Sequence, residues 1–135
     1  MLEMLTASPH ILRDRRALSP VGLKVFGRIA DRWKLTTTER LKLLGVSNPS
    51  TYHKWIKDPG HALLGRDTLE RISHILGIFA ALKILFPSQA TADAWVRKPN
   101  ATPLFAGKPA LDRMLAGNVS DLYVVRQYLD AVRGG

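Results

Sequence analysis

The 135-residue chain contains no cysteine, which excludes disulfides, thiolate metal sites and cysteine nucleophiles and fits a reducing compartment. It also lacks long hydrophobic runs. The longest uncharged apolar stretch, residues 73–82, has ten residues, whereas a membrane-spanning helix needs about twenty. Met1–Leu5 is too short for a signal peptide, and residues 10–16 are charged. We therefore expect a cytoplasmic protein without a membrane segment.

No stretch alternates apolar and polar residues as a half-buried strand does, so we expect an all-α fold. Acidic residues are scarce: 20 Lys and Arg stand against 11 Asp and Glu, a net charge of +9. Residues 1–66 hold 12 of these cations and only 5 of the acids, whereas residues 67–135 are nearly neutral. A basic front half favours binding to nucleic-acid phosphates, although this charge is also compatible with a role in solubility alone.

Residues for catalysis are missing too. The sequence holds no nucleophile elbow and no obvious carboxylate pair, and catalysis needs a positioned acid, base or nucleophile. Four histidines show no metal-ligand spacing such as HExxH, and they are His10, His53, His61 and His74. Gly60–Arg66 superficially resembles a phosphate loop but lacks its lysine. We expect no enzyme, no metal and no cofactor.

The segment Thr36–Lys57 predicts two short helices joined by a tight turn. The first helix is expected at Thr38–Leu44, with Thr36 or Thr37 as its hydroxyl cap. Gly45 should end it, because glycine tolerates the left-handed conformation of a helix stop. This pattern is typical of a helix-turn-helix, whose second helix lies in the DNA major groove.

Asn48 is expected to cap the second helix, and Pro49 fits its first position because an N–H is not needed there. Three apolar residues share one face and should pack inward, namely Tyr52, Trp55 and Ile56. The candidate DNA-binding residues are Asn48, Ser50, Thr51, His53, Lys54 and Lys57. Their hydroxyls, amides and cations suit base edges and phosphates. An ordinary helical hairpin with a solvated polar face is the alternative.

The chain is expected to divide into a flexible arm at 1–18, a helix-turn-helix bundle at 19–77 and a small helical domain at 78–135. Further helices are predicted at Ser19–Lys34 with Ser19 as cap, from Asp67 as cap to Gly77 as stop, and at Ile78–Phe86, Ser88–Val96, Pro109–Ala116 and Ser120–Arg133. Because Ile78–Phe86 is apolar on most sides, it must be buried in the core or against another subunit, which suggests a homodimer.

Two helical stripes complete this pattern. The last helix should bury one apolar stripe, formed by Leu122, Val125, Leu129 and Val132. The helix predicted at Ser19–Lys34 carries a cationic stripe formed by Lys24, Arg28 and Arg32. This stripe either follows DNA phosphates or is simply solvated. His74 is expected on a helix surface.

Short motifs follow one another along the second half of the chain. They are Leu85-Phe86-Pro87, Trp95, Pro99-Asn100, Leu104-Phe105-Ala106-Gly107, Pro109-Ala110-Leu111, Met114-Leu115-Ala116-Gly117 and the run Asp121–Asp130. Together they resemble the toxin-binding domain of Xre/MbcA/ParS antitoxins. Upstream, Leu43–Ser47, Thr51-Tyr52, Trp55 and Leu69–Ile72 resemble the Xre-like helix-turn-helix of the same family. The resemblance covers about residues 20–135.

This resemblance implies an antitoxin that holds a RES-domain toxin, an enzyme consuming NAD⁺, inactive through its C-terminal domain. It also implies that the N-terminal domain binds operator DNA of its own promoter. The candidate toxin-binding residues are Arg126, Leu129, Asp130, Arg133, Gly134 and Gly135. A dinucleotide site presents cations and N–H donors, so a tail ending in a carboxylate on two glycines would fit an anion position there.

Two alternatives stay open at this point. The tail is equally well a frayed terminus, as most chain ends are. The whole protein is alternatively a stand-alone helix-turn-helix regulator whose C-terminal half dimerises or binds a ligand. A neighbouring toxin gene would distinguish the antitoxin from the regulator.

Overall fold

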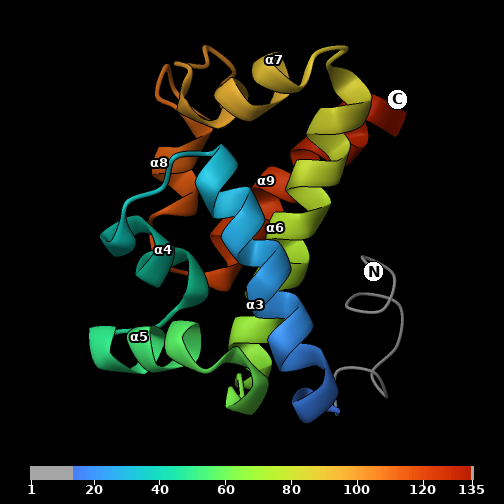
Figure 1. Ribbon diagram of the computed structural model, residues 1–135. Helices are drawn as coiled ribbons and strands as arrows, with labels where there is room; N and C mark the ends of the chain where they lie inside the picture. Colours follow the sequence, from blue (N-terminus) through green and yellow to red (C-terminus); the bar gives the residue numbers. More distant parts are fainter. Residues whose placement is uncertain (1–13, 135) are drawn as a thin grey trace.

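The computed structural model describes residues 14–134, which form an all-α fold, as the sequence predicts (Figure 1). The α-helices are α3 (Arg15–Arg32), α4 (Thr37–Leu44), α5 (Pro49–Lys57), α6 (Arg66–Leu85), α7 (Gln89–Ala94), α8 (Ala110–Met114) and α9 (Val119–Gly134). Two 3₁₀ turns, η1 (Pro59–His61) and η2 (Trp95–Arg97), connect them. Within 14–134, β-pairing is limited to one isolated bridge between Pro99 and Pro109. No helix in this part is long and apolar enough to cross a membrane.

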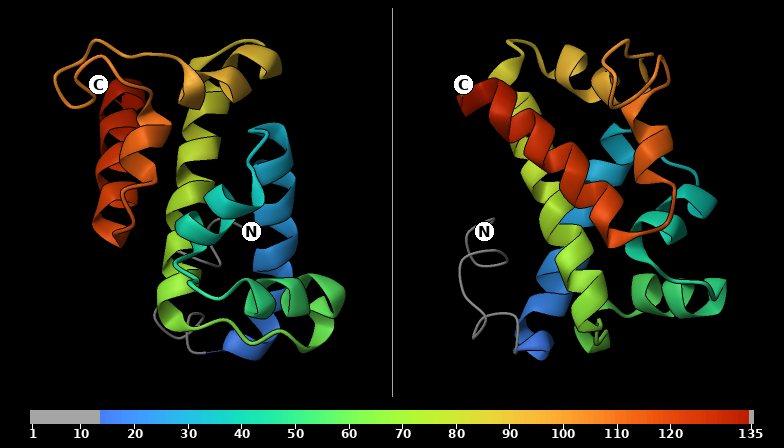
Figure 2. Two further views of the ribbon diagram at one scale, coloured as in Figure 1. Left: turned by 90° about the vertical axis from the view of Figure 1, so that its left-hand side faces the viewer. Right: turned by 180° about the vertical axis from the view of Figure 1, so that it is seen from behind.

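Helix α6 is the axis of the molecule. Helices α3 and α9 both pack along it, α7 lies at one end and α5 at the other, and α8 lies beside α9 (Figures 1 and 2). Its inward side chains Leu69, Ile72, Ile75 and Ile78 are completely buried. Each follows the previous one by three residues, so neighbouring members of the set adjoin on the helix surface. The core is therefore continuous from the helix-turn-helix to the C-terminal helices.

The predicted helix stop at Gly77 is wrong. α6 continues through this residue to Leu85, because the glycine serves side-chain packing and not a turn. A Cβ built at Gly77 would lie 2.4 Å from the Nε atom of Arg126, so the missing side chain makes room for this guanidinium of α9. The division of the chain at residues 77 and 78 stays a prediction.

The first predicted helix also begins earlier than expected. α3 starts at Arg15, where the Asp14 side chain accepts a hydrogen bond from the Ala17 N–H at 3.3 Å. Ser19 is no cap: it is fully buried, and its hydroxyl accepts the Leu64 N–H at 2.8 Å. Residues 15–18, expected in a loose arm, are thus helical. Residues 1–13 of that predicted arm lie outside the described residues.

Three smaller expectations also fail. Asp67 does not cap α6, because Gly65 occupies the N-cap position and the Asp67 carboxylate pairs with Arg71 at 2.8 Å. Ser120, expected to cap the last helix, lies inside α9, which already begins at Val119. Val132 is 53% exposed, because it lies in the last turn of α9 beyond the buried stripe.

The apolar segment Ile78–Phe86 is mostly covered within one chain. Ile78, Ala81 and Leu82 are buried in the core, whereas Ile84 is 63% exposed. The segment therefore needs no second copy to bury it, and the homodimer stays a prediction.

Candidate nucleic-acid interface and C-terminal helix

The first helix of the helix-turn-helix has the predicted ends. Thr36 caps α4, and its hydroxyl accepts the Glu39 N–H at 3.1 Å while the Glu39 carboxylate accepts the Thr36 N–H at 2.9 Å. This reciprocal pair is a capping box. Gly45 follows α4 with a left-handed φ of 71°, which confirms it as the helix stop.

The start of the second helix is confirmed as well. The Asn48 side chain accepts the Ser50 N–H at 2.9 Å, and Pro49 occupies the first turn of α5. The inward face is only partly as predicted. Tyr52 is buried and Trp55 packs half-buried against the core, but Ile56 is 50% exposed. Helix α5 is short and lies at one end of the fold (Figure 1).

All six predicted DNA-binding residues come together on the outer side of α5. They line one open groove of about 520 Å³, and they are Asn48, Ser50, Thr51, His53, Lys54 and Lys57. Five of them are exposed and Thr51 is half-buried. The nearby Asp58 carboxylate contacts His61 at 2.9 Å, and within residues 14–134 no ion pair joins it to either lysine. Contact of this groove with DNA stays a prediction.

Two arginines that sequence reasoning missed hold α4 at both ends. The first is Arg71 of α6, which is only 9% exposed. It donates to the carbonyl oxygens of Gly117, before α9, at 3.0 Å and of Lys42, in the last turn of α4, at 3.5 Å. Its Nε atom pairs with Asp67 at 2.8 Å. Arg71 therefore connects the helix-turn-helix to the loop before α9.

The second is Arg97 of η2. It donates to the carbonyl oxygens of Trp33 at 3.0 Å and Lys34 at 2.8 Å, which lie beyond the end of α3. It also binds the Glu39 carboxylate of the capping box at 3.0 Å. Partial burial raises the pKa of Glu39, but the hydrogen bonds from Thr36 and Arg97 outweigh this and lower it below its ordinary value. No local sequence signal marks this role of either arginine, because the carbonyl groups that they bind are distant in the chain.

The predicted toxin-binding residues have different environments on α9. Leu129 is buried in the core, and Asp130 lies between the guanidinium groups of Arg126 at 3.7 Å and Arg133 at 3.5 Å. Arg133 and Gly134 are exposed at the end of the helix, and Gly135 lies outside the described residues. The end of α9 is thus an accessible cationic tip, whereas Leu129 serves the packing of the fold.

Arg126 points back into its own chain. Its guanidinium lies over Gly77 and within 3.5 Å of both the Ser73 carbonyl oxygen and the His74 Nδ1 atom. The expected surface position of His74 is wrong, since its side chain is only 13% exposed and its ring packs edge-on against Tyr123. Burial, together with the Arg126 charge, lowers the pKa of His74.

The described residues offer little for a metal. Within 14–134, no group of three His, Asp or Glu side chains is placed to hold a metal ion. The buried carboxylate of Asp121 is occupied by Arg113 at 2.8 Å and by the Asn118 N–H at 3.2 Å. Burial raises the pKa of Asp121, but these two partners outweigh that effect and lower it.

Two known protein families match the two parts of this chain. Residues 12–77 match the family described as the antitoxin Xre-like helix-turn-helix domain, and residues 81–135 match the antitoxin Xre/MbcA/ParS C-terminal toxin-binding domain. The uncharacterized protein y4oB of Sinorhizobium fredii is 53% identical over 116 residues, which cover 86% of this chain and 87% of that protein. No solved structure matches the chain significantly. The chain belongs to the Xre family of antitoxins, with a helix-turn-helix domain followed by a toxin-binding domain.

Proposed function

We propose that this antitoxin neutralises a RES-domain toxin that degrades NAD⁺, and that it represses its own operon through the helix-turn-helix. The observation that carries the proposal is the presence of both family domains on one chain, at residues 12–77 and 81–135. The RES class of the toxin is supported by the motifs of the C-terminal half, which resemble antitoxins with such partners. The complex would contain operator DNA, the toxin and a homodimer of this chain.

On the DNA side, the groove on α5 would lie in the major groove. Lys54 and Lys57 would contact phosphates, whereas Ser50, Thr51 and His53, which line the same groove, would contact base edges. Two copies would read a two-fold operator with half-sites about one helical turn apart or a multiple of it.

On the toxin side, the tip of α9 would enter the active-site cleft. Arg133 is exposed next to Asp130, and Gly134 adds no side chain that would hinder entry into a narrow site. Arg126 would act indirectly, by fixing α9 against α6.

The test is to copurify the tagged protein from its native host and to identify its partner. NAD⁺ consumption by the toxin is then measured in the complex with the full chain and with a chain lacking Gly134 and Gly135. We expect the shortened chain to bind the toxin but no longer to inhibit its NAD⁺ consumption. The matched control is Lys108→Ala, an exposed cation far from the end of α9 in sequence, which should leave inhibition intact.

Each result has a defined meaning. Unchanged inhibition by the shortened chain would refute the inserted tail, although the antitoxin assignment would stand if the toxin still copurified. A chain that brings down no toxin but binds its own promoter would instead be a stand-alone regulator.

A further inference from the structure

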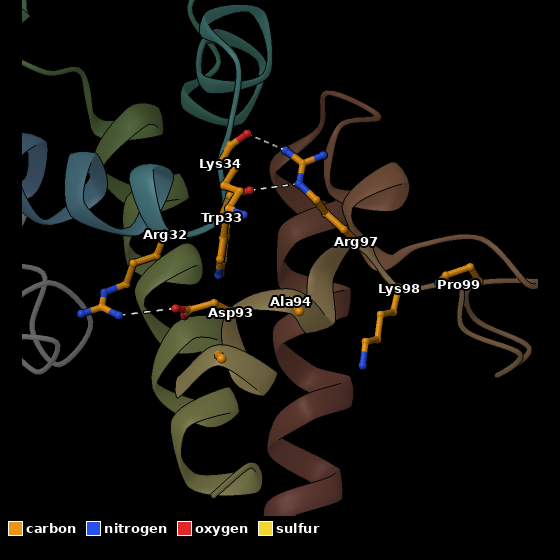
Figure 3. Close-up of a pocket in the computed structure, with 9 residues that line it drawn as sticks. Arg32, Trp33, Lys34, Asp93, Ala94, Arg97, Lys98 and Pro99 are labelled. Carbon is orange, nitrogen blue, oxygen red and sulfur yellow. Dashed lines mark hydrogen bonds and ion pairs between the residues drawn. The ribbon is translucent and has the colours of Figure 1, made fainter. Parts of the chain in front are cut away.

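A second pocket lies at the end of α3 that is far from α5. It occupies about 500 Å³ between the C-terminal end of α3 on one side and α7 with η2 on the other (Figures 1 and 3). This volume is within the range of pockets that bind small molecules, about 300–1,000 Å³. The pocket is not part of the DNA groove, and it involves none of the residues predicted to contact the toxin.

The pocket carries a strong excess of positive charge. Four cations line it, namely Arg32, Lys34, Arg97 and Lys98, against the single carboxylate of Asp93. Asp93 is paired with Arg32 at 3.4 Å, and Arg97 is already bonded to two carbonyl groups and Glu39. Lys34 and Lys98 are exposed, and within residues 14–134 neither has an ion pair. These two ammonium groups remain available for an anion.

The inner wall of the pocket is apolar but holds one unused donor. Trp33, Ala90 and Ala94 line it; the two alanines are exposed, whereas Trp33 is only 1% exposed. The Nε1 atom of Trp33 is buried and has no hydrogen-bond partner in the described part of the chain. In Figure 3 this edge of the indole points toward α7 near Asp93. Buried donors without a partner are rare in proteins, so the atom indicates a place for an acceptor.

We propose that this pocket binds a small organic anion that combines a flat apolar ring with a phosphate or carboxylate group. The ring would lie against the small, exposed side chains of α7, and a shift of α7 on binding would bring a ring acceptor to the covered Nε1–H of Trp33. The anionic group would lie at the rim between Lys34 and Lys98. Nucleoside monophosphates and aromatic carboxylic acids share this chemistry. The proposal is independent of the toxin and of DNA.

Calorimetric titration of the full chain in phosphate-free buffer tests this site. The probes are adenosine monophosphate and 4-hydroxybenzoate, with adenosine and inorganic phosphate as the separated halves of the nucleotide. We expect at least one ring-bearing anion to bind, and we expect each half to bind about tenfold more weakly or worse. Tighter binding of the nucleotide would identify the ligand as a nucleotide, and tighter binding of 4-hydroxybenzoate would identify it as an aromatic acid.

Matched variants locate the binding site. Lys34→Ala and Lys98→Ala should each weaken binding by about tenfold, because each removes one charge-assisted contact. Lys54→Ala removes the same charge from α5 and should leave binding unchanged. Trp33→Phe keeps an aromatic ring at this position but removes the Nε1 donor, so it should weaken binding. If Trp33→Phe does not fold, the two lysine variants still test the site. Tryptophan fluorescence of the chain should change on binding and lose that change in Trp33→Phe.

Three outcomes would overturn the proposal. The first is the absence of binding by both ring-bearing anions up to about 1 mM. The second is inorganic phosphate binding as tightly as the nucleotide, since the attraction would then be one of charge alone. The third is binding that Lys54→Ala abolishes and Lys34→Ala does not, which would place the site on α5.

Discussion

At the scale of single residues, two glycines are places where arginine side chains cross a backbone. Gly45 lies under Arg71 and Gly77 lies under Arg126, and a Cβ at either position would approach the guanidinium to 2.6 Å or less. Each arginine then reaches carbonyl oxygens of a different helix or loop. The two glycines differ in backbone conformation, because only Gly45 is left-handed.

Gly45→Ala should therefore destabilise the fold. The left-handed conformation alone costs a non-glycine residue about 1–2 kcal/mol, and displacement of Arg71 adds to this. The control is Gly27→Ala in α3, where a Cβ meets nothing within 4 Å and the free energy of unfolding should rise by about 0.5–1 kcal/mol. Urea unfolding measures both variants. Equal effects of the two substitutions would contradict the packing described for Gly45.

His74 should make the stability depend on pH. Burial and the Arg126 charge lower its pKa, while Glu70 opposes them. In the unfolded chain histidine has a pKa of about 6.5, so the unfolded state binds the proton more readily. The free energy of unfolding should consequently fall as the pH drops below about 6.5.

Urea unfolding between about pH 7.5 and pH 5 checks this expectation. His74→Gln should lose less stability over this range than the unchanged protein. His53→Gln, at an exposed position on α5, should behave like the unchanged protein. A steeper loss in His74→Gln would show that the folded state binds the proton more tightly, the reverse of the expected sign.

At the scale of elements, α4 depends on Arg97 for its orientation. Arg97→Ala removes two bonds to carbonyl groups beyond α3 and one to the Glu39 carboxylate. We expect a loss of about 1 kcal/mol, since the partners remain near solvent. Backbone amides of the capping box should also exchange faster. The control is Lys98→Ala, which removes the adjacent exposed cation. Equal destabilisation by both variants would show that Arg97 does not orient α4.

Helix α5 should bind DNA through its two lysines. Lys54→Ala and Lys57→Ala should each weaken binding to all sequences and reduce the slope of log affinity against log salt by about 0.9. Fluorescence anisotropy with promoter DNA at several salt concentrations measures the slope. Lys108→Ala should leave it unchanged, and a lysine variant with an unaltered slope makes no phosphate contact.

The sequence predicts best those features that depend on neighbouring residues. The ends of α4 and α5 follow from Thr36, Gly45 and Asn48, because capping is local chemistry. By the same local rules Gly77 looks like a helix stop. Only the position of Arg126, which is distant in the chain, shows that the glycine is a packing site. Sequence also groups the six groove residues correctly, because they share one short helix.

Other features were beyond local reasoning. The pocket at Trp33 and the links through Arg71 and Arg97 join segments that are far apart in sequence. A hydroxyl such as that of Ser19 resembles a cap, yet its bond to the Leu64 N–H depends on how α3 meets the segment before α6. Such contacts follow from the tertiary fold, and no periodicity or cap in one segment indicates them.

At the scale of the whole molecule, the shared helix α6 should make unfolding a single event. Trp33 lies at the end of α3, Trp55 in α5 and Trp95 in η2, so the three indoles report on different regions. Variants that keep one tryptophan each should unfold at the same urea concentration as the circular dichroism signal. Earlier loss of the Trp55 signal would indicate that the helix-turn-helix melts separately.

The uninterrupted passage of α6 between the two matched segments limits how the protein can diversify. One residue inserted near position 78 would turn everything downstream by about 100°, since an α-helix has 3.6 residues per turn. Such an insertion would change the orientation of α9 and its C-terminal end relative to α5. A chain that joins one half to a different partner half must therefore keep the phase of this helix if the end of α9 is to stay at the same angle to α5.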